Sequence, residues 1–184
     1  MEKLALVLEV ASELIAGTRP EEWSAPTPCS AWDVRRLVEH LVGMNLVFAA
    51  MLTDQSPPQR GEDLLGDDPI GAYRNSASAL LAAFAQPAVL DTTFQGPLGP
   101  ATGAERLQIR LYDLLAHVWD LGQATDQPVQ VPDDLAHQVL VFVRRQLSAH
   151  PRGDRFGPAQ PVSDDAPAID QLVAFLGRSP SRAQ

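Results

Sequence analysis

The sequence predicts an all-α protein, built as a four-helix bundle with additional helices toward the C-terminus. Apolar residues recur every three or four positions through most of the chain, as they do along one face of an α-helix. Proline and glycine interrupt this periodicity where helices would begin and end. The alternating pattern of strands is nearly absent. Amphipathic helices of this kind bury their apolar faces by packing side by side, which favours a bundle.

The first two helices are predicted at residues 2–16 and 30–52. Gly17 follows the last apolar residue of the first and ends it. Ser30 and Asp33 have the S-x-x-[DE] spacing of a capping box, so the second helix is expected to begin at residue 30. One stripe of this helix is apolar and consists of Val34, Leu37, Leu41, Met44 and Phe48.

The other two bundle helices are predicted at residues 69–86 and 102–125. Pro69 suits a first helical position, and Pro87 ends the third helix. Thr102 and Glu105 form a second capping box that starts the fourth. The intervening "TTFQGPLGP" predicts a short extended pair or an irregular loop.

Two additional helices are predicted after the bundle. One runs from Pro132 to about residue 148, and a short one spans 166–177, capped by Asp165 and ended near Gly177. No internal repeat and no linker interrupts the pattern. A chain of 184 residues is long enough for one sizeable core, so we expect a single domain over 1–184.

The composition excludes several classes of function. A net charge of −9 argues against nucleic acid or an anionic membrane surface as the main partner. No apolar run approaches the ~20 residues of a membrane span. The single cysteine, Cys29, excludes an internal disulfide; with no recognisable signal peptide, this predicts a cytoplasmic protein. Cys29 precedes a helix N-terminus, which would favour a thiolate, although a buried structural thiol is the simpler interpretation.

The helix at 102–125 has an unusually wide apolar arc, which predicts a central position in the bundle. The remaining polar wedge holds Arg106, Arg110, Asp113, His117 and Asp120. Asp113 and His117 are four residues apart, so their side chains lie one turn apart and can converge. Two interpretations are open: the wedge is a solvent-exposed face with surface ion pairs, or Asp113 and His117 are metal ligands inside the bundle.

His40 is the candidate third ligand. It lies beside the apolar stripe of the second helix, where a histidine is also often a packing residue. Two imidazoles and one carboxylate form a catalytic zinc set with one open position for water or substrate. The predicted cofactor is therefore a divalent ion, zinc first, while the same donors also accept nickel, iron or manganese. Asp120 either orients His117 by a hydrogen bond or forms a salt bridge elsewhere.

These segments resemble a known family. "TPCSAWDVRRLVEHLVG" and "DLLAHVWDLGQATDQP" are similar to the two signature segments of the DinB-like superfamily, and in particular to the N-terminal domain of mycothiol-dependent maleylpyruvate isomerase. The ending "RFGPAQPVSDDAPAIDQLVAFLGR" resembles a branch of small actinobacterial metal-binding proteins. The resemblance implies a four-helix bundle, a divalent metal held by His40, Asp113 and His117, and a homodimer.

The chain departs from the isomerase pattern in two respects. The isomerase has glutamate at the position of Asp113, so the shorter side chain either binds the metal from a slightly closer helix or acts through water. The isomerase also carries a further C-terminal domain with groups for its substrate, which we expect this chain to lack. The resemblance therefore does not extend to maleylpyruvate as the substrate.

Two functional hypotheses follow. The first is a metal-dependent transferase or isomerase whose partners are a small-molecule thiol, of the mycothiol type, and an electrophilic substrate. Arg106 and Arg110 lie on the same wedge as the ligands and are predicted to bind a carboxylate of the cofactor or substrate, unless both are solvated. The second is a non-catalytic metal-binding or sensing module. A helical protein without metal is the remaining alternative.

Overall fold

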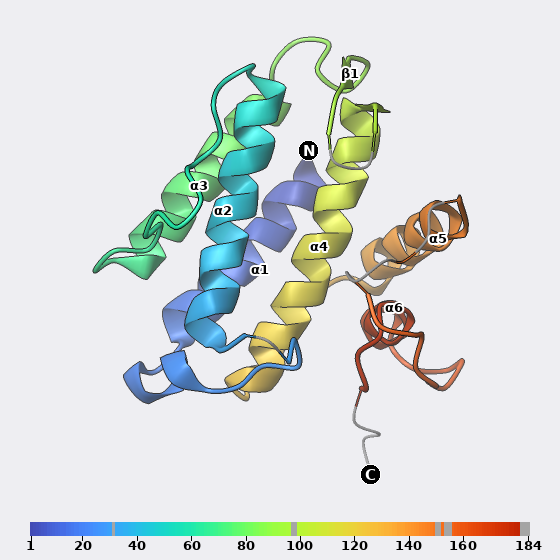
Figure 1. Cartoon of the computed structure of the whole chain (residues 1–184). Coiled ribbons are helices and arrows are strands. Elements are labelled where there is room, and N and C mark those ends of the chain that lie inside the picture. The colour runs from blue at the N-terminus through green and yellow to red at the C-terminus, as the bar shows by residue number, and fades with distance from the viewer. Residues whose placement is uncertain (31, 97–98, 150–151, 153–155, 181–184) are drawn as a thin grey trace.

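The structure is a computed structural model that describes residues 1–30, 32–96, 99–149, 152 and 156–180. Over these residues the fold is all-α, as predicted. Four helices lie along one another as a bundle (Figure 1): α1 (Glu2–Gly17), α2 (Val34–Leu52), α3 (Pro69–Phe84) and α4 (Gly103–Ala124). A short 3-10 helix, Pro20–Ser24, follows α1. None of the described helices has the length and apolar character needed to cross a membrane.

α4 is the central helix, as its wide apolar arc predicts. It packs against α1 and α2 within the bundle, and against the two additional helices α5 (Asp133–Ala149) and α6 (Ala168–Phe175) on its other side. Its apolar side chains are almost completely buried: Leu111, Leu114, Leu115, Val118 and Leu121. Because α4 has neighbours on both sides, much of its polar wedge is also enclosed by protein.

Local sequence signals fix the start of α4. Thr102 and Glu105 form the predicted capping box, in which the Glu105 amide donates to Thr102 Oγ1 at 3.2 Å and the Thr102 amide donates to Glu105 Oε2 at 2.7 Å. The predicted extended pair is present as the antiparallel strands β1 (Thr93–Phe94) and β2 (Ala101–Thr102). At Gly103 an added Cβ would lie 2.0 Å from the Val89 carbonyl oxygen, so only glycine permits this close approach.

The predicted start of α2 is wrong by four residues. The helix begins at Val34, and Asp33 is its N-cap, with Oδ1 accepting from the Arg36 amide at 2.8 Å. Before the helix, the Trp32 amide donates to the Cys29 carbonyl at 2.8 Å. The S-x-x-D pattern is ambiguous because its aspartate is itself a strong N-cap residue, and here Asp33 rather than Ser30 takes that role.

Two further helix ends differ from prediction. α3 ends at Phe84 rather than at residue 86. α6 begins at Ala168, and Asp165 does not cap it. The Ala168 amide instead donates to Asp133 Oδ1, at 2.7 Å, at the start of α5. A tertiary contact thus replaces the local cap that the sequence suggests, and it fastens the two additional helices together.

Candidate metal centre

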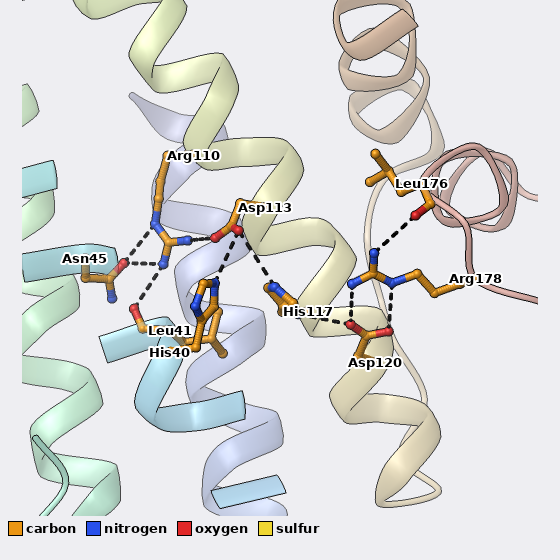
Figure 2. A network of polar contacts seen from close by, with 9 residues as sticks. All are labelled: His40, Leu41, Asn45, Arg110, Asp113, His117, Asp120, Leu176 and Arg178. Carbon is orange, nitrogen blue, oxygen red and sulfur yellow. Dashed lines mark hydrogen bonds and ion pairs between the residues drawn. The ribbon is translucent and has the colours of Figure 1, made fainter. Parts of the chain in front are cut away.

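The three predicted ligands come together between α2 and α4 (Figure 2). His40 projects from α2, and Asp113 and His117 project from consecutive turns of α4. Asp113 Oδ1 lies 3.3 Å from His40 Nε2 and 3.7 Å from His117 Nε2. One ligand atom from each residue lies within 4.8 Å of the others. Residues 73 positions apart therefore form one compact cluster.

The spacing of the cluster fits a divalent metal ion. Ligands bound tetrahedrally at about 2.0–2.1 Å are separated from one another by about 3.3–3.4 Å. The two distances from Asp113 Oδ1 to the histidine nitrogens are close to this separation. The cluster could hold a metal with Asp113 as a direct ligand, and the donor set of two nitrogens and one oxygen leaves the identity of the ion open.

The two oxygens of Asp113 have different partners. Oδ1 faces the histidines, while Oδ2 accepts a hydrogen bond from Arg110 Nη1. Burial alone would raise the pKa of this carboxyl, but His40 and Arg110 more than offset it and hold the pKa well below its ordinary value. Asp113 is therefore ionised at neutral pH and offers an anionic oxygen to a cation.

Arg110 is completely buried behind Asp113. Its Nε and Nη2 donate to Asn45 Oδ1 at 3.2 and 2.7 Å, and Nη2 also donates to the Leu41 carbonyl at 3.1 Å. Asn45 is fixed in turn, because its Nδ2 donates to Ser76 Oγ on α3 at 3.0 Å. The guanidinium thus orients Asp113 through a network that joins three helices, and the interpretation of the wedge as a solvent-exposed face is wrong here.

Asp120 orients His117 from the other side. Asp120 Oδ2 lies 3.0 Å from His117 Nδ1, and the aspartate side chain is completely buried. With a hydrogen on Nδ1, His117 would donate a hydrogen bond to this carboxylate. Its Nε2 would then carry the free lone pair on the side of the ring that faces the cluster, as a metal ligand requires. The same carboxylate accepts from Arg178, at 2.8 and 3.2 Å, in the segment after α6. Asp120 therefore both orients His117 and forms a salt bridge, the two roles that the sequence left open.

His40 and Trp32 form the outer wall of the centre. Burial lowers the pKa of His40, and the neighbouring Asp113 only partly opposes this shift. A neutral imidazole is the form that binds a metal. The Trp32 ring lies 4.6 Å from the His40 ring and 5.3 Å from the His117 ring, measured between centroids. Trp32 is thus in contact with both histidines of the cluster.

A cavity of about 390 Å³ opens beside His40. It lies between α2 and the segment before α3, and its lining includes Trp32, His40, Met44, Arg36, Arg60 and Leu64. A larger cavity, of about 630 Å³, lies at the far end of α2 near β1 and contains none of the predicted site residues. The cavity beside His40 therefore borders the cluster through one of its three residues.

Most of this chain matches a known protein family. The family model described as the mycothiol maleylpyruvate isomerase N-terminal domain matches residues 4–122, which include all three residues of the cluster. The chain belongs to this family. Two Mycobacterium tuberculosis proteins are similar over nearly the whole chain: uncharacterized protein Rv0738 of strain H37Rv and uncharacterized protein MT0763 of strain CDC 1551, each 34% identical over 169 residues, 90% of both chains. No solved structure was found to match.

The part of the chain that matches the isomerase N-terminal domain family ends at residue 122, before α5 and α6. Arg178 lies outside it, and sequence reasoning did not single it out. The only local signal was Gly177, which marks the end of α6. Nothing in the spacing indicates that the next side chain reaches Asp120, 58 residues earlier.

The two arginines predicted to bind a ligand are both buried, so neither is solvated. Arg106 donates to the Phe94 and Gly99 carbonyls at 2.9 and 2.6 Å, and it therefore fastens the hairpin segment to α4. Arg110 belongs to the centre but acts through Asp113. That Arg106 and Arg110 bind a carboxylate of a ligand stays a prediction. Each arginine would have to break the internal hydrogen bonds described here in order to bind that carboxylate.

The other candidate side chains are not members of the cluster. Cys29 is half-buried, and burial and the nearby Asp120 raise the pKa of its thiol, so the structure does not favour a thiolate. His137 is exposed on α5. His150 lies outside the described residues. No second group of three metal-ligating side chains occurs in the described part of the chain.

Proposed function

We propose that the protein is a divalent-metal-dependent enzyme that binds a low-molecular-weight thiol of the mycothiol type and directs its sulfur to an electrophilic carbon, in a transfer or an isomerisation. The observation that carries this proposal is the His40, Asp113 and His117 cluster at the edge of a cavity. Three protein ligands leave one tetrahedral position for an exogenous group, which is the arrangement of catalytic zinc sites. A closed set of four protein ligands would have supported the non-catalytic module instead.

The residues of the centre suit this chemistry. A bound divalent ion would supply the positive charge that lowers the pKa of a thiol and favours its thiolate. His40 and His117 would bind the ion as neutral imidazoles, and Asp113 would add one negative charge. Arg110 already balances that charge, so the metal-free centre does not contain an isolated buried anion.

The cavity suggests the class of substrate. Trp32, Met44 and Leu64 offer apolar contacts to the body of a small molecule. Arg60 is exposed in the lining, and no acidic side chain of the described residues forms an ion pair with it. Arg36 is already paired with Glu39. We therefore assign to Arg60 the binding of a carboxylate from the thiol or from an acidic electrophile.

The experiment combines metal analysis with a thiol-transfer assay. The metal content of the purified protein is measured for wild type, His40→Ala, His117→Ala and the exposed control His137→Ala. Metal-loaded protein is then mixed with mycothiol and a chloronitroaromatic electrophile. In the expected reaction the sulfur–carbon bond forms, chloride leaves and the thiol proton passes to solvent. We expect the first two variants to lose metal and turnover, and the control to keep both.

Two results would contradict the proposal in different ways. Equal metal content in His40→Ala, His117→Ala and wild type would show that these histidines do not bind a metal. Normal metal content without thiol-dependent turnover, across aromatic, enone and cis-enedioate electrophiles, would favour the non-catalytic metal-binding module. The panel matters because the geometry does not select one electrophile.

A further inference from the structure

Arg178 contacts the metal centre from a part of the chain that the family match does not include. Its Nη2 donates to Asp120 Oδ2 at 2.8 Å and its Nε donates to Asp120 Oδ1 at 3.2 Å, a bidentate pairing (Figure 2). The Arg178 side chain is only 10% exposed and that of Asp120 is not exposed at all. Asp120 Oδ2 therefore accepts from both Arg178 and His117.

The end of α6 delivers Arg178 to this position. Gly177 has φ +95°, in the left-handed region, and the Gly177 and Arg178 amides donate to the Ala174 and Val173 carbonyls at 3.0 and 2.9 Å. This pair of hydrogen bonds is a Schellman motif, which reverses the chain directly after a helix. A Cβ at Gly177 would also lie 2.8 Å from Gly157 Cα. The main chain at Gly177 and Arg178 is thus held by the hydrogen bonds to α6 and by its close approach to Gly157.

We propose that Arg178 is a positioning residue of the metal centre, holding the Asp120 carboxylate so that His117 presents Nε2 to the ion. A bidentate guanidinium fixes the plane of a carboxylate, which a single imidazole contact does not. Arg178 also balances the buried charge of Asp120, as Arg110 balances Asp113. The inference rests on the proposed metal centre and requires no particular reaction.

The test measures metal binding directly. The Zn²⁺ dissociation constant is determined by competition with a chromophoric chelator for wild type, Arg178→Gln, Arg178→Lys and Asp120→Asn. The matched control is Arg152→Gln. Arg152 also fastens the C-terminal segment, through the Phe175 and Gly157 carbonyls, but Asp120 is not among its partners. The absorption spectrum of the Co²⁺ form reports the ligand geometry independently of affinity.

We expect Arg178→Gln to weaken Zn²⁺ binding by about tenfold, within the 10–100-fold range typical of residues that orient metal-bound histidines. Its Co²⁺ spectrum should change, Arg178→Lys should restore part of the affinity, and Arg152→Gln should keep wild-type affinity and spectrum. In the double variant with Asp120→Asn, the effect of Arg178→Gln should largely disappear, because both residues act through one contact.

Several results would overturn the positioning role. One is wild-type affinity and spectrum in a folded Arg178→Gln protein; another is an equal loss in Arg152→Gln, which would reduce Arg178 to a fastener of the C-terminal segment. If Arg178→Gln is recovered unfolded, Arg178→Lys replaces it in the test. An ammonium cannot pair with both carboxylate oxygens in the same plane, so this variant should bind Zn²⁺ more weakly than wild type, and wild-type affinity would contradict the positioning role. Failure of wild type to bind either Zn²⁺ or Co²⁺ would instead contradict the metal centre itself.

Discussion

Asp113 Oδ1 lies 3.3 Å from His40 Nε2, so that a carboxylate of α4 and an imidazole of α2 meet between these two helices. The second oxygen of Asp113 is held by Arg110. Hydrogen bonds to Arg110 and Asp120 therefore hold Asp113 and His117 from within the protein. We expect the large apolar core, rather than a metal, to supply most of the stability of the fold, unlike in small zinc modules, where the metal is needed for folding.

Removal of the metal should leave the fold intact. We expect a chelator to leave the helical circular dichroism signal unchanged while lowering the melting temperature. At a free metal concentration 100 times the dissociation constant, the ion would add about 2.7 kcal/mol to the free energy of unfolding. His117→Ala should show no metal-dependent change in melting temperature. Loss of helical signal on chelation would show instead that the fold depends on the metal.

Replacement of Arg110 should be costly even without metal. Arg110→Met leaves Asp113 without its buried guanidinium partner, and removal of one member of a buried pair typically costs about 3–5 kcal/mol. Urea unfolding of the metal-free protein measures this cost. The control is Arg35→Met, because Arg35 is exposed and its pair with Asp63 is solvated, so the change should stay within about 0.5 kcal/mol. Similar costs for the two variants would refute the structural role of Arg110.

Acid should destabilise the metal-free protein partly through Asp120. Burial alone would raise the pKa of this carboxyl, but the hydrogen bonds from His117 and Arg178 outweigh it and lower the pKa. As the pH falls, the unfolded state therefore binds a proton at Asp120 before the folded state does. The contribution of Asp120 to the free energy of unfolding is thus present above the ordinary aspartate pKa of about 3.9 and is lost as the pH falls below it.

Asp120→Asn is the variant that measures this contribution. Its free energy of unfolding, followed by urea titration between pH 5 and the acid limit of folding, should depend less steeply on pH than that of wild type. The difference in slope should be at most about 1.4 kcal/mol per pH unit, the value for one proton. Asp91→Asn, at an exposed position, should keep the wild-type slope. Equal slopes in wild type and Asp120→Asn would contradict the lowered pKa.

The cavity assignment predicts a selective effect at Arg60. Arg60→Gln should raise KM for a carboxylate-bearing thiol or electrophile and leave kcat and metal content nearly unchanged, because the contact is equally present in the ground and transition states. An uncharged ester of the same molecule should show no difference between variant and wild type. Arg35→Gln is the control, since Arg35 does not line the cavity. A raised KM for the ester as well would point to a disturbed loop instead.

The parts of the fold that were predictable depend on local patterns. The capping box of Thr102 and Glu105 was predicted because both partners lie within four residues. The central position of α4 followed from the width of its apolar arc, since a helix surrounded by protein needs apolar side chains on several sides. The start of α2 was missed because two local rules used the same Asp33, and sequence alone does not rank them.

The centre was predictable only in part, for a related reason. Asp113 and His117 are neighbours along one helix. His40 lies beside the apolar stripe of another bundle helix, and the family resemblance pointed to the same residue, so the trio could be named in advance. The burial of Arg110 could not, because it depends on Asn45 and on the Leu41 carbonyl of α2. Arg178 was missed because only the path of the chain through α5 and α6 returns it to α4. Long-range contacts of this kind produce no periodic pattern in the sequence.

Trp32, already described as a wall of the centre, gives the protein an optical property. Its indole ring contacts the rings of both His40 and His117, whereas Trp119 is engaged with Asp170 on α6. A cation next to an indole perturbs its π system. The emission of Trp32 should therefore change when an ion enters, and Trp32→Phe should abolish that change. The unlabelled chain then reports its own occupancy by fluorescence, which makes stopped-flow measurement of metal entry and release possible.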